Sequence, residues 1–229
     1  MDEPPFDVSG GWESRTIELV GHSFELLLPA DPDSILETRL AAEERGDTPA
    51  SGGSNDPYWA ALWSSASPTA AAVLEATWVG DESVLELGCG IGLVGLAALA
   101  RGLPVTFSDC SEQAVQLALY NARRNGFHNA QCLRLDWRRP PTVALAERYP
   151  VILASDILYN RSNHAPILQT LDRLLAPRGE CWIGDPGRFN SREFLQLASR
   201  RFRVKLRGRD GGVFFVPQSG HYQMFVLGH

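Results

Sequence analysis

The most regular feature of the chain is an alternation between two patterns of apolar residues. Short apolar runs are typical of buried strands, and segments whose apolar residues recur every three or four positions are typical of helices. From residue 84 onward the two patterns alternate, which predicts an α/β fold with a mostly parallel sheet and right-handed crossovers. The predicted strands are Val84–Leu87, Val105–Ser108, Cys132–Leu135, Val151–Ala154 and Cys181–Gly184, and the predicted helices are Leu93–Arg101, Glu112–Asn125 and Ala165–Leu175.

The part of the chain before residue 84 predicts separate elements. Residues 15–28 read as a hairpin that turns at Gly21, and residues 31–45 read as a helix. Residues 46–57 are rich in Gly, Ser, Pro and Asp and have no apolar period, so we expect a loop there. Another helix is expected after Pro68.

The later part of the chain carries helix caps, a turn and two more strands. Ser111 is expected to cap the start of a helix, and Asn125-Gly126 its end. Pro177–Gly179 predicts a turn before the fifth strand. The last two predicted strands are Val204–Arg207 and Tyr222–Leu227, and residues 213–216 could join either or neither.

Composition limits the classes of function. The 229 residues, 44% of them hydrophobic, suit one large domain with an ample core. The net charge of −6 argues against non-specific binding of nucleic acid by the whole surface. A basic stretch, Arg200–Arg209, alternates with apolar residues. We interpret it as the solvated face of a strand, and a docking patch for an acidic partner is the alternative.

The sequence also bears on compartment and metal binding. No run of eighteen apolar residues occurs, and the start, Met1–Phe6, has neither a basic flank nor an apolar stretch. We therefore expect no membrane span, no signal peptide and a cytoplasmic monomer. No CxxC pair or His-x-x-x-His is present, so we expect reduced thiols and no metal site. The scattered cysteines are Cys89, Cys110, Cys132 and Cys181.

A predicted strand that runs directly into glycines carries the strongest chemical signal. Residues 83–92 read Ser-Val-Leu-Glu-Leu-Gly-Cys-Gly-Ile-Gly, and a helical pattern follows. Glycines let the backbone approach a ligand closely, and the amide groups at a helix start lie at the positive end of the helix dipole. A strand, glycine loop and helix in this order predict a nucleotide-binding loop.

The glycines fit two nucleotide templates. Gly90, Gly92 and Gly95 match GxGxxG, and Asp109 lies where a ribose-binding carboxylate belongs, which taken alone permits NAD. Glu86 together with Gly88, Gly90 and Gly92 matches Glu-x-Gly-x-Gly-x-Gly. A carboxylate at position 86 is a costly core residue without a positive partner. S-adenosylmethionine brings an ammonium and a sulfonium and NAD brings no matching cation, so Glu86 favours S-adenosylmethionine.

Two more acids end the second and third predicted strands. Asp109 would hold the ribose hydroxyls of the cofactor, and Asp136 would hold the adenine amino group. Each acid alone could equally be a turn or helix-cap residue. Together with Glu86 and the glycines they form a row along one sheet edge, which supports a cofactor site.

The segment Val84–Gly92 resembles motif I of the seven-strand, Rossmann-like methyltransferases. The resemblance covers about residues 58–227 and implies a sheet of order 3-2-1-4-5-7-6 whose last strand is antiparallel. The hairpin and helix before it then form an accessory element. We therefore divide the chain into an N-terminal extension, residues 1–57, and a methyltransferase domain, residues 58–229.

The residues after the fourth predicted strand point to the acceptor. Strands one and four flank the switch point of such a sheet, where ligands bind, so Asp156 is expected to face the methyl group. Asp156-x-x-Tyr159 resembles the signature of a lysine-directed branch of these enzymes. A helix-capping aspartate with a core tyrosine is the alternative.

Two further segments resemble the same branch. Residues 56–65 read Asp-Pro-Tyr-Trp-Ala-Ala-Leu-Trp-Ser-Ser, and residues 183–188 read Ile-Gly-Asp-Pro-Gly-Arg. Both look most like the lysine methyltransferase of the electron-transfer flavoprotein β subunit and its bacterial relatives. The chain departs from that branch at Ser64, where proline is common, and at Asn160, where an acid often follows the tyrosine.

The resemblance implies a role for each candidate residue. Asp156 would orient the acceptor amine as a catalytic residue, and Tyr159 would shape the channel. The implied cofactor-binding residues are Trp63, Glu86, Gly88, Cys89, Gly90, Gly92, Asp109, Asp136, Trp137 and Ser155, and the implied substrate-binding residues are Tyr58, Trp59, Asp185 and Arg188. Core packing of Trp59 and Trp63, and a plain turn at Asp185 and Arg188, stay open as alternatives.

We therefore expect an S-adenosylmethionine-dependent N-methyltransferase that acts on a protein lysine, with the electron-transfer flavoprotein β subunit as candidate acceptor. Alternatives are a nicotinamide-like small-molecule N-methyltransferase, an NAD-dependent oxidoreductase, and a binding module that has lost catalysis. The oxidoreductase would need hydride-transfer groups, and no Tyr-x-x-x-Lys is present. The acidic charge and the missing Asn-Pro-Pro-Tyr signature disfavour methylation of nucleic acid.

Overall fold

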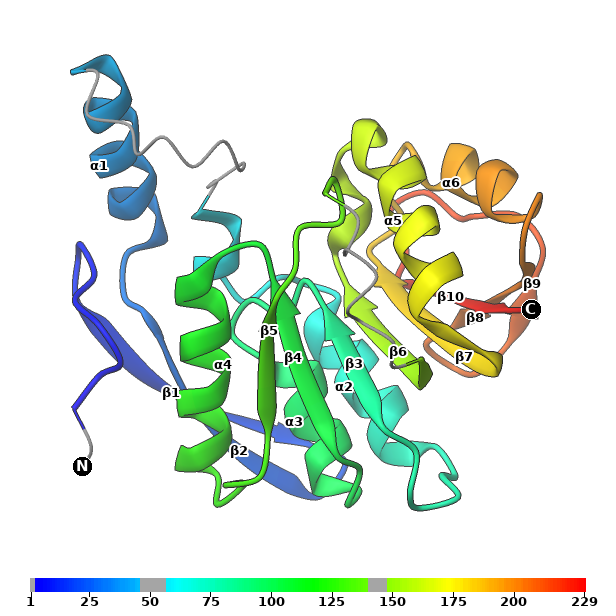
Figure 1. The fold of residues 1–229 in the computed structure, drawn as a ribbon, viewed down its shortest axis with the longest axis horizontal. Coiled ribbons are helices and arrows are strands. Elements are labelled where there is room, and N and C mark those ends of the chain that lie inside the picture. The colour runs from blue at the N-terminus through cyan, green and yellow to red at the C-terminus, as the bar shows by residue number, and fades with distance from the viewer. Residues whose placement is uncertain (1–2, 46–56, 140–147) are drawn as a thin grey trace.

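A mixed eight-stranded sheet forms the centre of the fold in the computed structural model, which describes residues 3–45, 57–139 and 148–229 (Figure 1). Neighbouring strands are parallel from β5 to β7, and β10 is antiparallel to both of its neighbours. Across the sheet the strands are β5 (Gln131–Arg134), β4 (Val105–Asp109), β3 (Val84–Leu87), β6 (Tyr149–Ser155), β7 (Leu175–Asp185), β10 (Gln223–Gly228), β8 (Arg203–Gly208) and β9 (Val213–Phe214). In the order of the predicted strands, the sheet reads 3-2-1-4-5-7-6, with β9 added at its edge.

Helices cover both faces of the sheet, which confirms the predicted α/β class. Successive residues of a strand point to opposite faces, so β3 sends Val84 into one core and Leu85 into the other. Helices α2 (Ala66–Glu75), α3 (Leu93–Ala100) and α4 (Glu112–Arg124) pack on the Val84 side. Helices α5 (Arg161–Leu174) and α6 (Ser191–Ala198) pack on the Leu85 side.

The N-terminal hairpin packs against this framework through α4. Strands β1 (Trp12–Leu19) and β2 (His22–Pro29) are joined by Val20 and Gly21, which both have a positive φ, as a tight hairpin turn requires. Phe24 and Leu26 of β2 share the core of α2, α3 and α4. Helix α1 (Pro32–Glu44) follows the hairpin. Except for Pro57, the loop expected at 46–57 lies outside the described residues, and the domain boundary there stays a prediction.

Asn121 ties the hairpin to the rest of the molecule. This fully buried residue of α4 accepts a hydrogen bond from Leu27 N at 2.8 Å and donates one to Leu27 O at 3.1 Å. Its side-chain nitrogen also donates to Ile91 O at 3.0 Å, in the glycine loop that follows β3. One side chain therefore links β2, α4 and the glycine loop.

The structure confirms the predicted caps of α4 but not the predicted turn before the fifth strand. Ser111 caps α4 by accepting a hydrogen bond from Ala114 N, and Gly126 has the positive φ of a helix end, as expected. The turn predicted at Pro177–Gly179 is wrong, because these residues lie inside β7, where the pairing with β6 shifts register. The sequence patterns also missed α6, which is only eight residues long. No helix of the described residues is long and apolar enough to cross a membrane.

Candidate active site

The loop after β3 folds around glycines that no other residue type would replace without strain. Gly88, Gly90 and Gly92 have φ values of 69°, 51° and 87°, in the left-handed region. A Cβ on Gly88 would lie 2.8 Å from Cγ2 of Ile157, across the site. A Cβ on Gly92 would instead meet Ala118 of α4 at 2.9 Å. Gly88 therefore lets the loop pass close to Ile157 at the wall of the site, whereas Gly92 lets α3 pack closely on α4.

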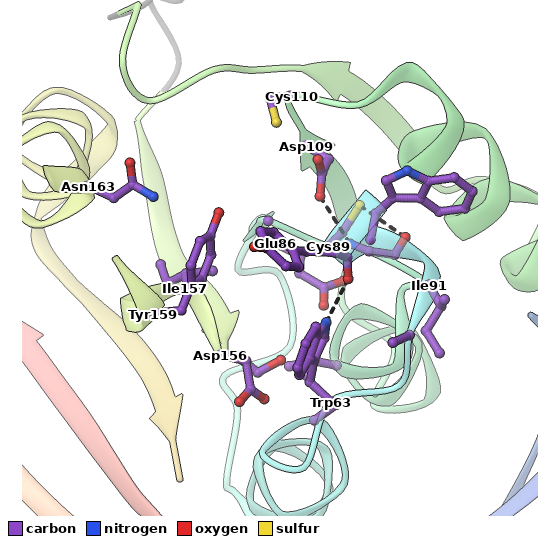
Figure 2. Close-up of a pocket in the computed structure, with 18 of the residues that line it drawn as sticks. Trp63, Glu86, Cys89, Ile91, Asp109, Cys110, Asp156, Ile157, Tyr159 and Asn163 are labelled. Carbon is purple, nitrogen blue, oxygen red and sulfur yellow. Dashed lines mark hydrogen bonds between the residues drawn. The ribbon is translucent and has the colours of Figure 1, made fainter. Parts of the chain in front are cut away.

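This loop lines a cavity of about 390 Å³ at the carboxyl ends of β3 and β6 (Figure 2). Figure 2 shows Asp109 and Asp156 on opposite sides of Glu86. Three candidates, Gly92, Asp136 and Asp185, do not line the cavity. The candidates that do line it are Tyr58, Trp59, Trp63, Glu86, Gly88, Cys89, Gly90, Asp109, Trp137, Ser155, Asp156, Tyr159 and Arg188.

The two acids on the glycine-loop side are held by backbone amides. Glu86 is 2% exposed, and its Oε2 accepts a hydrogen bond from Gly95 N, at the start of α3, at 2.9 Å. Burial raises the pKa of Glu86 to about 8, against the lowering effect of that hydrogen bond. Asp109 accepts from Gly90 N at 3.2 Å and from Ser111 N at 2.9 Å. Burial also raises the pKa of Asp109.

The third acid of the predicted row, Asp136, does not line the cavity and is paired with an arginine. Asp136 forms an ion pair with Arg138, Nε to Oδ1, at 3.0 Å. Partial burial acts to raise the pKa of Asp136, but the hydrogen bonds from Arg138 outweigh it and the pKa is lowered. Trp137 and Arg138 line the cavity in its place. The contact between Asp136 and an adenine amino group stays a prediction.

Asp156 lines the wall of the cavity opposite Asp109. It follows β6 with a φ of 60°, which is uncommon for a residue other than glycine. Its Oδ2 accepts from Ser65 N at 2.9 Å, and its Oδ1 accepts from Ser65 Oγ at 3.2 Å. Nη2 of Arg188 donates to the same Oδ1 at 2.8 Å. Burial raises the pKa of Asp156, although these donors act to lower it.

Asp185 was expected to contact substrate, but the structure places it away from the cavity. The side chain is fully buried, outside the cavity. Its Oδ1 accepts hydrogen bonds from Gly187 N, Arg188 N, Ser191 Oγ and Gln223 Nε2. Asp185 therefore holds the turn that carries Arg188 and the start of α6. The turn that the sequence offered as an alternative reading is the better description of this residue.

Aromatic side chains form the mouth of the cavity. Tyr58, Trp63 and Tyr159 line the cavity and are each between 40% and 46% exposed. The ring centroids of Tyr58 and Tyr159 are 5.2 Å apart, and Nε1 of Trp63 donates to the Tyr58 carbonyl at 2.6 Å. Trp59 is buried beneath them, in contact with Phe6 of the N-terminal segment at 5.9 Å between rings.

Among the residues of this site that the sequence patterns missed, two bond directly to predicted acids. Arg138 follows Trp137 directly and lines the cavity, but nothing in its sequence position marks it. Ser65 holds Asp156 through two hydrogen bonds and precedes α2, where serine commonly caps a helix. That cap signal identifies a helix start, and only the folded chain shows that the serine faces Asp156.

Comparison with known proteins places the chain among methyltransferases. A family model described as lysine methyltransferase matches residues 59–201. The chain is 32% identical over 105 residues to histidine protein methyltransferase 1 homolog of Dictyostelium discoideum, which covers 44% of the chain and 34% of the relative. It is 32% identical over 143 residues to protein N-lysine methyltransferase METTL21A of Danio rerio, which covers 61% and 60%. The chain thus spans about a third to three fifths of the length of these curated relatives.

Solved structures agree in fold. A TehB-like SAM-dependent methyltransferase from Corynebacterium glutamicum superposes with a TM-score of 0.58, covering 84% of this chain and 98% of the other. The two sequences are 17% identical, so the likeness concerns the fold.

Proposed function

The chain belongs to the lysine methyltransferase family whose model matches residues 59–201, and we propose that it methylates the side-chain amine of a lysine in a protein substrate. One observation carries this proposal: the glycine loop and Asp156, the two parts that the sequence assigned to cofactor and acceptor, open into a single cavity. The family assignment decides against the alternative of an NAD-dependent oxidoreductase.

The cofactor is S-adenosylmethionine, and the residues on the glycine-loop side fit it. Gly88 and Gly90 bring the loop backbone to the wall of the cavity, and the buried acids Glu86 and Asp109 suit a ligand with a cationic group and ribose hydroxyls. The cavity volume of about 390 Å³ lies in the range of small-molecule sites. When bound, S-adenosylmethionine supplies a methyl group whose bond to sulfur breaks as the amine nitrogen forms its bond to carbon.

The residues of the chain contribute alignment and exclusion of water. In our proposal, Asp156 orients the acceptor amine, and Tyr58 and Tyr159 enclose the aliphatic part of the lysine side chain. Alignment of this kind supplies roughly 7–11 kcal/mol of barrier reduction. An ammonium is not a nucleophile, so the amine must lose its proton to water before the transfer; its reference pKa is about 10.4.

The specific protein substrate that we propose is the β subunit of the electron-transfer flavoprotein. Support comes from the residues that resemble that branch, because Tyr58, Trp59, Asp156, Tyr159 and Arg188 all line one cavity. The mouth carries exposed aromatic side chains, as suits a protein that presents one side chain to the cavity.

The test is transfer of radiolabelled methyl groups from S-adenosylmethionine to purified electron-transfer flavoprotein β subunit and, separately, to a cell lysate. We expect label in a protein, at a lysine identified by mass spectrometry. Asp156→Ala should lower turnover at least 100-fold and leave affinity for S-adenosylhomocysteine unchanged. Asp172→Ala, at an exposed aspartate paired with Arg201, is the matched control. Label in a small molecule, or full turnover by Asp156→Ala, would contradict the proposal.

One comparison favours a second acceptor. The Dictyostelium relative is a histidine protein methyltransferase homolog, and an imidazole nitrogen is also a neutral nucleophile when deprotonated. The mass spectrum of the labelled peptide separates the two, because the methyl group will lie on lysine or on histidine.

A further inference from the structure

The carboxylate expected to hold the acceptor amine is already surrounded by donors of the protein itself. Oδ2 of Asp156 accepts from the Ser65 amide, and Oδ1 accepts from the Ser65 hydroxyl and from Arg188. The side chain of Asp156 is 4% exposed. An ammonium group that approached this carboxylate would meet a charge that Arg188 already balances, although Oδ2, with one donor, can still accept a hydrogen bond from the acceptor amine.

Arg188 is fixed in this place by a second acid. Its amide donates to Oδ1 of Asp185 at 2.9 Å, and its Nε lies 3.6 Å from Oδ2 of Asp185. Asp185 is itself held by donors from α6 and β10. The guanidinium is 25% exposed and lines the cavity, so its charge is presented to whatever enters.

We infer that Arg188 is a positioning residue. Its positive charge balances that of Asp156 and disfavours binding of an ammonium group, so that the acceptor amine enters in its neutral form. The inference rests on the proposed amine methylation. It resolves a conflict in that proposal: an unpaired Asp156 would stabilise the protonated amine, which cannot attack a methyl group. A paired Asp156 removes that preference, and a guanidinium nearby favours the neutral amine.

Other charged groups around the site do not replace Arg188. Arg138 lies on the far wall and is engaged by Asp136. Tyr222 is half-buried; burial and, to a smaller extent, the nearby Asp156 carboxylate raise its pKa to about 12. The remaining titratable side chains that line the cavity are Tyr58, Glu86, Cys89, Asp109, Cys110 and Tyr159.

The test uses n-butylamine, which is a lysine side chain without its backbone, and 1-butanol as its neutral counterpart. Both are titrated into protein saturated with S-adenosylhomocysteine, and binding is followed by NMR shifts of the backbone amides of Ser65 and Gly187. At pH 7.5 only about one n-butylamine molecule in a thousand is neutral, so the wild type should bind 1-butanol at least a hundredfold more tightly than n-butylamine. Arg188→Gln should bind n-butylamine at least tenfold more tightly than 1-butanol.

A pH series sharpens the test. Between pH 7.5 and 10.5 the neutral fraction of n-butylamine grows, so its affinity for the wild type should rise and its affinity for Arg188→Gln should not. 1-Butanol at each pH corrects for titration of the tyrosines and cysteines. Arg192→Gln, at an exposed arginine four residues away, is the matched control.

The possible outcomes are distinct. An unchanged preference in Arg188→Gln, or a strong preference of the wild type for ammonium, overturns the inference. If Arg188→Gln does not fold, Asp156→Asn decides: it leaves the guanidinium unbalanced and should shift preference towards 1-butanol. These binding measurements need no turnover, so the failure of any protein to accept label overturns only the proposed function.

Discussion

The two walls of the cavity hold their acids in different ways. On the glycine-loop side, Glu86 and Asp109 accept from backbone amides that lie within nineteen residues of them. Within the described part of the chain, neither acid forms an ion pair. On the opposite side, Asp156 is held by Ser65, 91 residues away, and by Arg188, 32 residues away. On one wall the acids are held by a local motif without a cationic partner among the described residues; on the other, a long-range network pairs Asp156 with Arg188.

The largest effect should come from Glu86, the least solvated of these charges. Its pKa is raised from 4.5 to about 8, so the folded protein keeps a proton that the unfolded chain loses. Stability should therefore fall as pH rises from about 4.5 to 8, by up to about 5 kcal/mol at roughly 1.4 kcal/mol per pKa unit. Denaturant unfolding of ligand-free wild type and Glu86→Gln across this range checks this. Because Asp109 and His164 titrate in both proteins, the difference between the two isolates Glu86.

Equal slopes in the two proteins would show that Glu86 is ionised in the folded state. The contrast between the walls would then lie only in which groups donate to the acids. S-adenosylmethionine should flatten the slope of the wild type, because a cation beside Glu86 lowers its pKa.

A smaller effect, on affinity alone, should come from Gly88. Gly88→Ala places a methyl group 2.8 Å from Ile157 and should weaken S-adenosylhomocysteine binding about 100-fold, or about 2.8 kcal/mol. Isothermal titration calorimetry measures this. Gly102→Ala is the matched control, because Gly102 has a φ of 81° and a Cβ there meets nothing within 4 Å. Similar affinities of the two variants would mean that strain, not the cavity, explains any loss.

The smallest effect should come from Ser65, on the acceptor wall. Ser65→Ala removes one 3.2 Å hydrogen bond to Asp156 and keeps the backbone one, so kcat/KM should fall roughly five- to tenfold, or about 1 kcal/mol. Affinity for cofactor should not change. Ser111→Ala, which removes the cap of α4 on the other wall, should cost about 1 kcal/mol of stability and spare kcat. A loss of cofactor affinity in Ser65→Ala would show that the walls are not independent.

The contrast between local and long-range contacts also explains which features the sequence could predict. The strands and the glycine loop follow from apolar runs and from residues adjacent in the chain, and these were placed correctly. The roles of Asp185 and Ser65 depend on which strands become neighbours, so no local pattern contains them. The segment at Pro177–Gly179 was read as a turn because proline and glycine favour turns, but pairing with β6 continues on both sides of it.

Asn121 has a consequence for the order in which the chain can fold. The backbone of β2 that it binds precedes it by 94 residues, so during synthesis the hairpin exists for roughly 5 to 20 s before its anchor is made. Throughout that time the apolar face of β2 lacks α4, and it is exposed to other chains. The glycine loop also bonds to Asn121, so the cofactor site cannot be complete before α4 has been made.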